Sequence, residues 1–386
     1  MNMKSFIKVF VIIIVCISVM MSCKTEKQIV ADITPVELVG SETYFNDTLY
    51  LADMHEVKLE CNAKSILNTI GKIIEIDDNI YILDVALNQI VIFDSCGNYI
   101  NTINHVGRGR GEYIHLVDMT YDKSKDEIVC LVDPSALIYY KKNGTHIRTE
   151  RLDGYYTDIF ADTSYIYLYN STYANAKIPE YTIECINKQT GIKTNLLEFQ
   201  DEYAPFCSMG AKMFGNGDGM YFVRKFDNNI YHVAEGDIDG IYELNLKDYS
   251  FPQEKLDRKY ECDEIFRYCK KNKYAYMFTN LIFGDSYVMF SSNLFDMHVI
   301  STVEKKDRHY SYMNVTKYNI PTSLYRPVES SKKRCCFILK PVAILNLKKL
   351  YNSDERMRKN ISADFIKYTE NITMDSNPIL LFYNIR

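Results

Sequence analysis

The chain has 386 residues and a formal net charge of −5, with 25% charged and 47% hydrophobic residues. Lysine and arginine do not exceed the acids and form no basic stripe, which excludes the composition that is typical of nucleic-acid-binding proteins. The hydrophobic content is sufficient for a large core. Tyrosine is abundant, at 32 residues, and tryptophan is missing; tyrosine suits strands that keep one polar edge in water.

The first predicted element is a secretory signal peptide. Met1–Met21 carries two lysines and then an apolar run that is too short for a transmembrane helix. A small residue precedes Cys23, as in a loose lipobox, so we expect Cys23 to be lipidated with acyl chains such as palmitate. The alternative is an ordinary signal peptide that is cleaved elsewhere. Lys24 follows the cysteine and favours the outer membrane over the inner membrane.

The sequence therefore predicts a lipoprotein signal peptide over residues 1–22, a lipidated tether over 23–40 and one folded domain over 41–386. Several acyl chains anchor a protein firmly, whereas one chain alone binds a membrane only marginally. Loss of residues 1–22 removes two lysines and no acid, which makes the net charge of the mature chain −7. No later segment is long and apolar enough to cross a membrane.

The domain contains a repeat. Gly97, Gly144 and Gly191 stand 47 residues apart, and each closes a strand–turn–strand unit. The first predicted strand is either Ile73–Ile76 or Ile80–Leu83. The strands that follow in the three units are Ile90–Phe93, Tyr99–Ile103, Ile128–Val132, Ile138–Tyr140, Thr145–Thr149, Tyr165–Tyr169, Tyr181–Ile186 and Ile192–Phe199. One such small sheet cannot bury its apolar face alone, so the units must pack against each other.

The repeat weakens after Gly191, but turn signals continue and favour an all-β array. Further short strands are predicted up to the C-terminus, with two helical insertions at Asp257–Lys273 and Val342–Lys359. Dividing the length of the domain by the repeat and allowing for the insertions favours six blades over seven. The prediction is a six-bladed β-propeller with four-stranded antiparallel blades and short helical insertions. The alternative is a two-sheet sandwich in which the glycine spacing is a coincidence.

Three segments carry a resemblance to a known family. Ile73–Ile103, Val106–Tyr113 and Asp375–Leu381 resemble the six-bladed β-propeller lipoproteins of gram-negative gut-type bacteria, which are relatives of the NHL-type propellers. The family usually has Gly-x-Gly-Pro-Gly-Glu-Tyr after its first blade, and Arg110 replaces the proline here. The resemblance implies a propeller at the cell envelope and no particular biochemical activity. It also implies that the ring is closed by both ends of the chain, through pairing of Glu56–Glu60 with Pro378–Ile385.

The sharpest candidate site is the loop Gly107–Tyr113. Its glycines free the backbone, while Arg108 and Arg110 present two guanidinium groups that could hold a carboxylate, sulfate or phosphate. We assign ligand binding to these arginines together with Glu112 and Tyr113. The alternative is that the glycines only let the chain cross between blades and that Glu112 pairs with Arg108.

Other polar residues give weaker signals. Asp84 and Asp133 end predicted strands; they could bind Ca²⁺ in a central channel, but such residues more often cap a turn. The histidines show no metal-ligand spacing, and the cysteines show no disulfide framework. We expect few or no disulfides, no cofactor and no bound metal, and no catalytic residues can be assigned.

The sequence therefore predicts an outer-membrane lipoprotein that faces the periplasm or the cell exterior. The predicted function is non-catalytic binding of a glycan, a peptide or an envelope protein, with the membrane contacted through the N-terminal lipid. The alternative is a metal-dependent hydrolase or lyase with its site in the propeller channel. Nucleic acid is not an expected partner.

Overall fold

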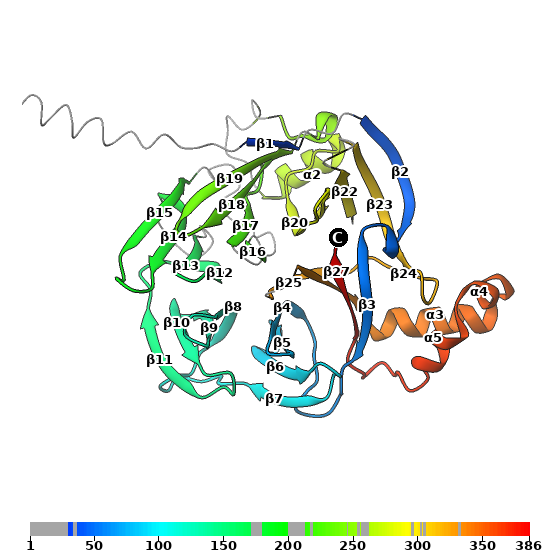
Figure 1. The fold of residues 1–386 in the computed structure, drawn as a ribbon, viewed down its shortest axis with the longest axis horizontal. Helices are drawn as coiled ribbons and strands as arrows, with labels where there is room; N and C mark the ends of the chain where they lie inside the picture. Colours follow the sequence, from blue (N-terminus) through cyan, green and yellow to red (C-terminus); the bar gives the residue numbers. More distant parts are fainter. Residues whose placement is uncertain are drawn as a thin grey trace, which may run out of the picture.

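The computed structural model describes residues 30–33, 37–170, 180–199, 213–216, 219–244, 246–252, 255, 262–294, 297–301, 303, 306–330 and 333–386. The described residues form six sheets that are arranged radially around a central axis (Figure 1). Each sheet is built on four antiparallel strands, which confirms the predicted six-bladed β-propeller.

The first three blades follow each other along the chain. Blade 1 contains β4 (Ile70–Ile76), β5 (Asn79–Asp84), β6 (Gln89–Asp94) and β7 (Tyr99–Ile103). Blade 2 contains β8 (His115–Asp122), β9 (Glu127–Asp133), β10 (Ala136–Tyr140) and β11 (His146–Arg151). Blade 3 contains β12 (Tyr156–Ala161), β13 (Tyr165–Asn170), β14 (Tyr181–Asn187) and β15 (Lys193–Glu198).

The last three blades also use strands from the N-terminal part of the chain. Blade 4 contains β16 (Met213–Asn216), β17 (Gly219–Val223), β18 (Asn229–Ala234), β19 (Asp237–Leu244) and β1 (Val30–Ile33). Blade 5 contains β20 (Phe278–Phe283), β21 (Tyr287–Ser292), β22 (Met297–Ser301), β23 (Lys306–Val315), β24 (Ile320–Thr322) and β2 (Glu37–Asn46). Blade 6 contains β25 (Tyr325–Val328), β26 (Arg334–Leu339), β27 (Ile379–Ile385) and β3 (Leu51–Lys58).

The ring is closed by β3, the outermost strand of blade 6. It pairs antiparallel with the C-terminal strand β27, from Leu51 opposite Ile385 to Lys58 opposite Ile379, which confirms the predicted closure by both ends of the chain. Two further N-terminal strands were not predicted. Strands β1 and β2 add to the outer edges of blades 4 and 5 and run parallel to β19 and β23. The segment assigned to the tether therefore pairs with the propeller from Val30 onward.

The inner strands of each blade are apolar on both faces because both faces meet a neighbouring blade. In β5, Ile80 and Ile82 pack toward blade 6, whereas Tyr81 and Leu83 pack toward blade 2. The same alternation creates a separate cluster of buried side chains at each of the six seams between blades. This arrangement explains why the sequence shows continuous apolar runs in place of a simple alternation.

The repeated glycines lie at the seams. Gly97 has a φ of +89°, and a Cβ there would stand 2.4 Å from the carbonyl oxygen of Lys58 in blade 6. Gly144 has a φ of +84°, and its Cβ would stand 2.9 Å from the side chain of Ile103 in blade 1. The hairpins at Gly97 and Gly144 therefore touch the outer part of the preceding blade, whereas a Cβ at Gly191 would meet nothing within 4 Å.

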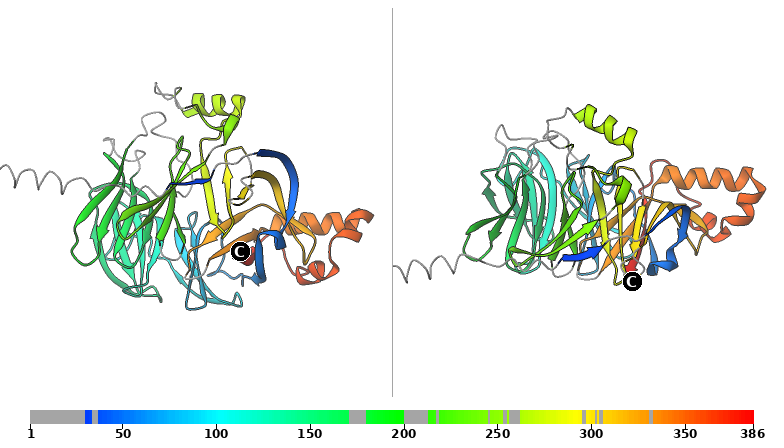
Figure 2. Two further views of the ribbon diagram at one scale, coloured as in Figure 1. Left: turned by 45° about the horizontal axis from the view of Figure 1, so that its top comes forward. Right: turned by 90° about the horizontal axis from the view of Figure 1, so that it is seen from above.

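The antiparallel order gives the ring two distinct faces. The connection face carries the links between blades and the turns between second and third strands, such as residues 59–69, 85–88 and 104–114. The hairpin face carries the remaining turns and the C-terminus, on the side of the ring away from α2 (Cys262–Asn272) (Figure 2).

The predicted helical insertions are confirmed. Helix α2 lies in the link between blades 4 and 5, and α3 (Pro341–Ser353), α4 (Glu355–Asn360) and α5 (Ala363–Tyr368) lie between β26 and β27 and project outward from the ring (Figure 1). Among the described residues, no helix has the length and apolar character that crossing a membrane requires.

Candidate functional site

The loop Gly107–Tyr113 lies on the connection face, between β7 of blade 1 and β8 of blade 2. Its two ends are tied together, since the Gly107 amide donates to the carbonyl of Tyr113 at 2.8 Å and the Tyr113 amide donates to the carbonyl of His105 at 3.0 Å. The Tyr113 ring is buried, and its hydroxyl donates to the carbonyl of Asn88 at 2.8 Å. Burial also raises the pKa of Tyr113. Tyr113 therefore serves as an anchor beneath the loop.

Blade 2 holds the other side of the loop. Gly111 has a φ of +76°, and a Cβ there would stand 2.5 Å from the ring of His146, so the position requires glycine. The carbonyl of Gly111 accepts a 2.7 Å hydrogen bond from the buried hydroxyl of Tyr140. His105 stacks on the same Tyr140 ring. Hydrogen bonds thus fix the loop to both blade 1 and blade 2.

The two arginines of the loop point away from this framework. Arg108 and Arg110 are exposed, and neither contacts an acidic side chain within the described part of the chain. The carboxylate of Glu112 accepts a 2.6 Å hydrogen bond from the Gly109 amide and lies against Gly107. The structure thus shows the local pairing of Glu112 with the loop backbone, where the sequence alternative had paired it with Arg108.

The candidate aspartate Asp84 is a turn cap. It ends β5, the second strand of blade 1, and its side chain is fully buried. Its carboxylate accepts hydrogen bonds from four backbone amides, those of Asn68 (2.5 Å), Thr69 (3.2 Å), Ala86 (3.0 Å) and Leu87 (3.1 Å). Four N–H donors satisfy both oxygens, so the capping role applies and the carboxylate does not face the channel as a cation ligand. Asp133 ends β9 in the equivalent place, and its carbonyl accepts from the Ile114 amide.

A polar network that the sequence did not reveal crosses the channel. The ammonium group of Lys72, on the inner strand β4, contacts Asp118 Oδ2 at 2.8 Å. It also donates to the carbonyls of Met119 at 2.8 Å and Ile159 at 3.1 Å, on the inner strands of blades 2 and 3. The side chains of Lys72 and Asp118 are 14% and 10% exposed, so this ion pair is largely removed from water.

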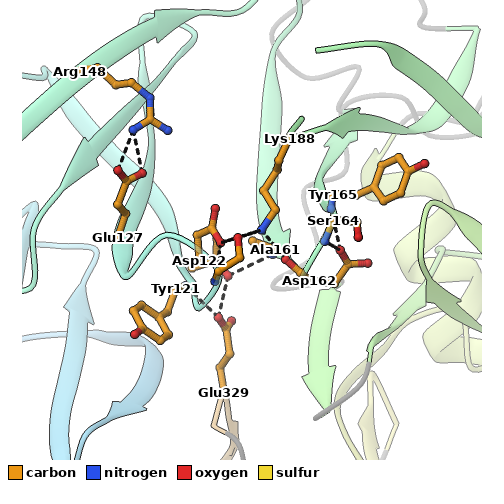
Figure 3. A network of polar contacts seen from close by, with 12 residues as sticks. Tyr121, Asp122, Glu127, Arg148, Ala161, Asp162, Ser164, Tyr165, Lys188 and Glu329 are labelled. Atoms are coloured by element: carbon orange, nitrogen blue, oxygen red, sulfur yellow. Dashed lines mark hydrogen bonds and ion pairs between the residues drawn. The ribbon is translucent and has the colours of Figure 1, made fainter. Parts of the chain in front are cut away.

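Glu329 joins blade 6 to the same network. Its carboxylate lies 3.8 Å from the Lys72 ammonium group and accepts from the Thr120 hydroxyl at 2.6 Å. It also accepts from the Tyr121 amide at 3.1 Å (Figure 3). Its backbone pairs with Ile73 and Glu75 of blade 1. Four blades therefore meet at one buried cluster of charges.

Burial and charge shift the pKa values of this cluster. Burial raises the pKa of Asp118 to about 6, while the nearby Lys72 ammonium group opposes that rise. Burial acts to lower the pKa of Lys72, but the charges of Asp118 and Glu329 outweigh it and hold the pKa above its usual value. The only sequence signal was the presence of Lys72 in β4, a mostly apolar strand that also contains Glu75.

A second buried ion pair joins blades 2 and 3 near the hairpin face. The Lys188 ammonium group contacts Asp122 Oδ1 at 2.6 Å, the Ser124 hydroxyl at 2.8 Å and the carbonyl of Asp162 at 2.6 Å (Figure 3). The side chains of Lys188 and Asp122 are 5% and 0% exposed. Near this ion pair, Nη1 of Arg148 donates to both carboxylate oxygens of Glu127 within blade 2. These contacts join strands within blade 2 and join blade 2 to blade 3.

The described residues contain no cluster of three or more histidine, cysteine or acidic side chains that could hold a metal ion. The cysteines in the described part are free thiols. Cys61 and Cys96 are exposed, and the buried ones are Cys130, Cys185, Cys269, Cys335 and Cys336. Burial raises the pKa of Cys185 and of Cys269 to about 12, which keeps these thiols protonated and unreactive at neutral pH.

The comparison with solved structures supports this fold through a protein that aligns over its whole length. A presumed exported protein of Bacteroides fragilis is 14% identical and aligns with a TM-score of 0.68 over 91% of this chain and 100% of its own. A DUF4221-family protein of Bacteroides vulgatus is 11% identical and aligns with a TM-score of 0.49 over 87% of this chain and 97% of its own. None of the curated proteins matches this sequence. The chain does match, over residues 32–384, the family described as "Domain of unknown function (DUF4934)", and it belongs to that family.

Proposed function

We propose that the chain is an outer-membrane lipoprotein whose propeller binds a glycan, a peptide or an envelope protein on its connection face without catalysing a reaction. The observation that carries this proposal is the loop Gly107–Tyr113. It is fixed from below by Tyr113 and Tyr140, yet it holds Arg108 and Arg110 in solvent with no acidic partner among the residues that the structure describes. Guanidinium groups held on a rigid loop suit recognition of an anionic group, because little order is lost on binding.

The proposed location rests on the N-terminal segment. The signal peptide and the cysteine at position 23 favour lipidation, and the similar Bacteroides fragilis protein is described as presumed exported. Strand β1 begins at Val30 on the outer edge of blade 4. Seven residues span at most about 25 Å when fully extended. An anchor at Cys23 would therefore keep the outer edge of blade 4 close to the membrane.

The alternative, a metal-dependent hydrolase or lyase in the channel, receives less support from the same contacts. Asp118 is paired with Lys72 and accepts a 2.9 Å hydrogen bond from the Ile159 amide. Glu329 accepts from Thr120 and Tyr121. A cation would have to displace Lys72 and several hydrogen bonds before these acids could bind it, and each lost bond to a charged group costs about 1.5–3 kcal/mol.

Binding measurements test the proposal. Arg108→Ala combined with Arg110→Ala should weaken binding of sulfated oligosaccharides or acidic peptides and leave the cooperative melt unchanged. Arg356→Ala, which removes an exposed arginine of α4, is the matched control and should change neither. Turnover of a lactone, glycan or peptide that one channel substitution abolishes, together with a stoichiometric metal ion, would instead establish the enzyme.

A further inference from the structure

The connection face over blade 1 carries an unusual group of exposed aliphatic side chains. They belong to three loops, and the exposed fractions are 45% for Ile66, 39% for Val85, 37% for Leu87, 52% for Val106 and 41% for Ile114. We call these five residues the aliphatic strip. Single exposed apolar residues are normal on a protein surface, but a contiguous group of them marks an interaction site.

Hydrogen bonds show that the three loops are neighbours. The carbonyl of Ile66 accepts from the side chain of Gln89 at 3.1 Å, and the Val85 amide donates to the carbonyl of Thr69 at 3.1 Å. Asn88 then joins the second loop to the third, since its side-chain oxygen accepts from the Leu116 amide at 3.0 Å. The five residues of the strip therefore lie on three adjacent loops, from the link that enters blade 1 to the link that leaves it.

The loops beneath the strip are held in place. The buried carboxylate of Asp84 binds backbone amides of both the first and the second loop. Buried Tyr113 joins the second loop to the third. A surface held in this way loses little conformational entropy when a partner binds, which favours a docking role.

The charges around the strip are unbalanced. Arg108, Arg110 and Lys64 are exposed and contact no acid within the described part of the chain. The same loops carry these three cations against two acids, and amide groups hold both acids. Glu112 accepts from the Gly109 amide, and Glu60 accepts from the Tyr99 amide at 2.8 Å and from Asn62 at 2.9 Å. The chain as a whole has a formal net charge of −5. Unpaired cations next to the strip therefore favour a partner that carries negative charge.

We infer that the aliphatic strip and its arginines form a docking surface for a polypeptide that presents aliphatic side chains beside acidic ones. This inference rests on the proposed binding function and names the ligand class. A polypeptide matches both features at once, because its side chains can fill the strip while its carboxylates meet Arg108 and Arg110. The exposed carbons of the strip are aliphatic and offer no aromatic ring.

The test uses the full chain and a fluorescent peptide of alternating glutamate and leucine. Lysine–leucine and glutamate–serine peptides of equal length are the controls for charge and for apolar contact. Leu87→Asp with Val106→Asp should weaken binding of the glutamate–leucine peptide about tenfold or more. Arg108→Ala with Arg110→Ala should weaken it and reduce its salt dependence. Ile192→Asp, at a 62% exposed position in a turn of the hairpin face, is the matched control and should leave binding unchanged.

Several results would overturn the inference. They are a failure of the glutamate–leucine peptide to bind at millimolar concentration, equal binding of the lysine–leucine peptide, and equal weakening by Ile192→Asp. Sedimentation could show that the chain self-associates and that Val106→Asp abolishes this self-association. That result would identify a second copy of the chain as the partner of the aliphatic strip. The protein could also bind an oligosaccharide, with binding unchanged by Leu87→Asp with Val106→Asp. This result would overturn the inference of a polypeptide partner but leave the proposed binding function in place. Metal-dependent turnover in the channel would overturn the proposed function alone.

Discussion

Replacing Lys72 with methionine tests whether the buried charges at the channel hold the blades together. Methionine keeps most of the volume but removes the ammonium group that Asp118 and the carbonyls of Met119 and Ile159 share. Removing one partner of a buried ion pair costs about 3–5 kcal/mol, because the other charge stays buried. We expect the free energy of unfolding to fall by that amount near neutral pH.

The destabilisation should depend on pH in a defined direction. Burial raises the pKa of Asp118 to about 6 in the native protein, and loss of Lys72 should raise it further. An unfolded aspartate binds a proton only below about pH 4. The folded variant therefore binds more protons than the unfolded chain above that pH, and its stability falls as the pH rises. Near pH 4, where Asp118 is protonated, only the two carbonyls remain unsatisfied and the loss should shrink to about 1–3 kcal/mol.

Urea unfolding, followed by far-ultraviolet circular dichroism at about pH 4.5 and about pH 7.5, measures both values against the wild type at the same pH. Lys142→Met is the matched control. It removes a more exposed lysine that pairs with Asp77 and Asp126 and should cost less than about 1 kcal/mol. Adding Asp118→Asn to Lys72→Met should restore part of the loss. The decrease in the free energy of unfolding could instead be equal at both pH values, or larger at the acidic one. Either result would refute the unpaired Asp118 carboxylate as its cause.

Three further outcomes are expected. Cys23→Ala should move the protein from the membrane fraction to the soluble fraction; unchanged retention after fractionation would refute lipidation at that residue. Ending the chain at Pro378 removes β27, the strand that pairs with both β26 and β3. Cooperative unfolding should then be lost in calorimetry, whereas a native-like transition would show that the ring closes without β27. Asp84→Ala leaves four backbone amides without their acceptor and should lower the free energy of unfolding by about 2–4 kcal/mol in urea. Asp78→Asn, in the exposed turn after β4 where φ is +63°, keeps a residue type that tolerates this conformation and should change it by less than about 0.5 kcal/mol.

Features set by neighbouring residues could be predicted from the sequence. The strands Ile80–Leu83 and Ile90–Phe93 carry β-branched apolar runs between clear turns, and they became β5 and β6. Gly97 marked a hairpin because its turn needs a positive φ. The terminal pairing of β3 with β27 followed from the resemblance to a closed ring.

Features set by distant residues could not be predicted. Lys72 binds Asp118 and Ile159, which lie 46 and 87 positions away, and no local pattern encodes those contacts. Strands β1 and β2 join edges that exist only after blades 4 and 5 have formed. In the candidate loop, no sequence pattern distinguishes a Glu112–Arg108 pair from the observed hydrogen bond between Glu112 and the Gly109 amide.

The pairing of β3 with β27 has a consequence for the order in which the protein is assembled. Leu51 emerges early during synthesis or export, but its partner Ile385 is the second-last residue of the chain. Until then the edges of β3 and β27 are unpaired, and unpaired edges invite wrong pairing with other chains. Bringing together ends so far apart in sequence is also slow. Closure of the ring therefore waits for the delivery of β27, and products that lack this strand should be substrates for proteases and chaperones.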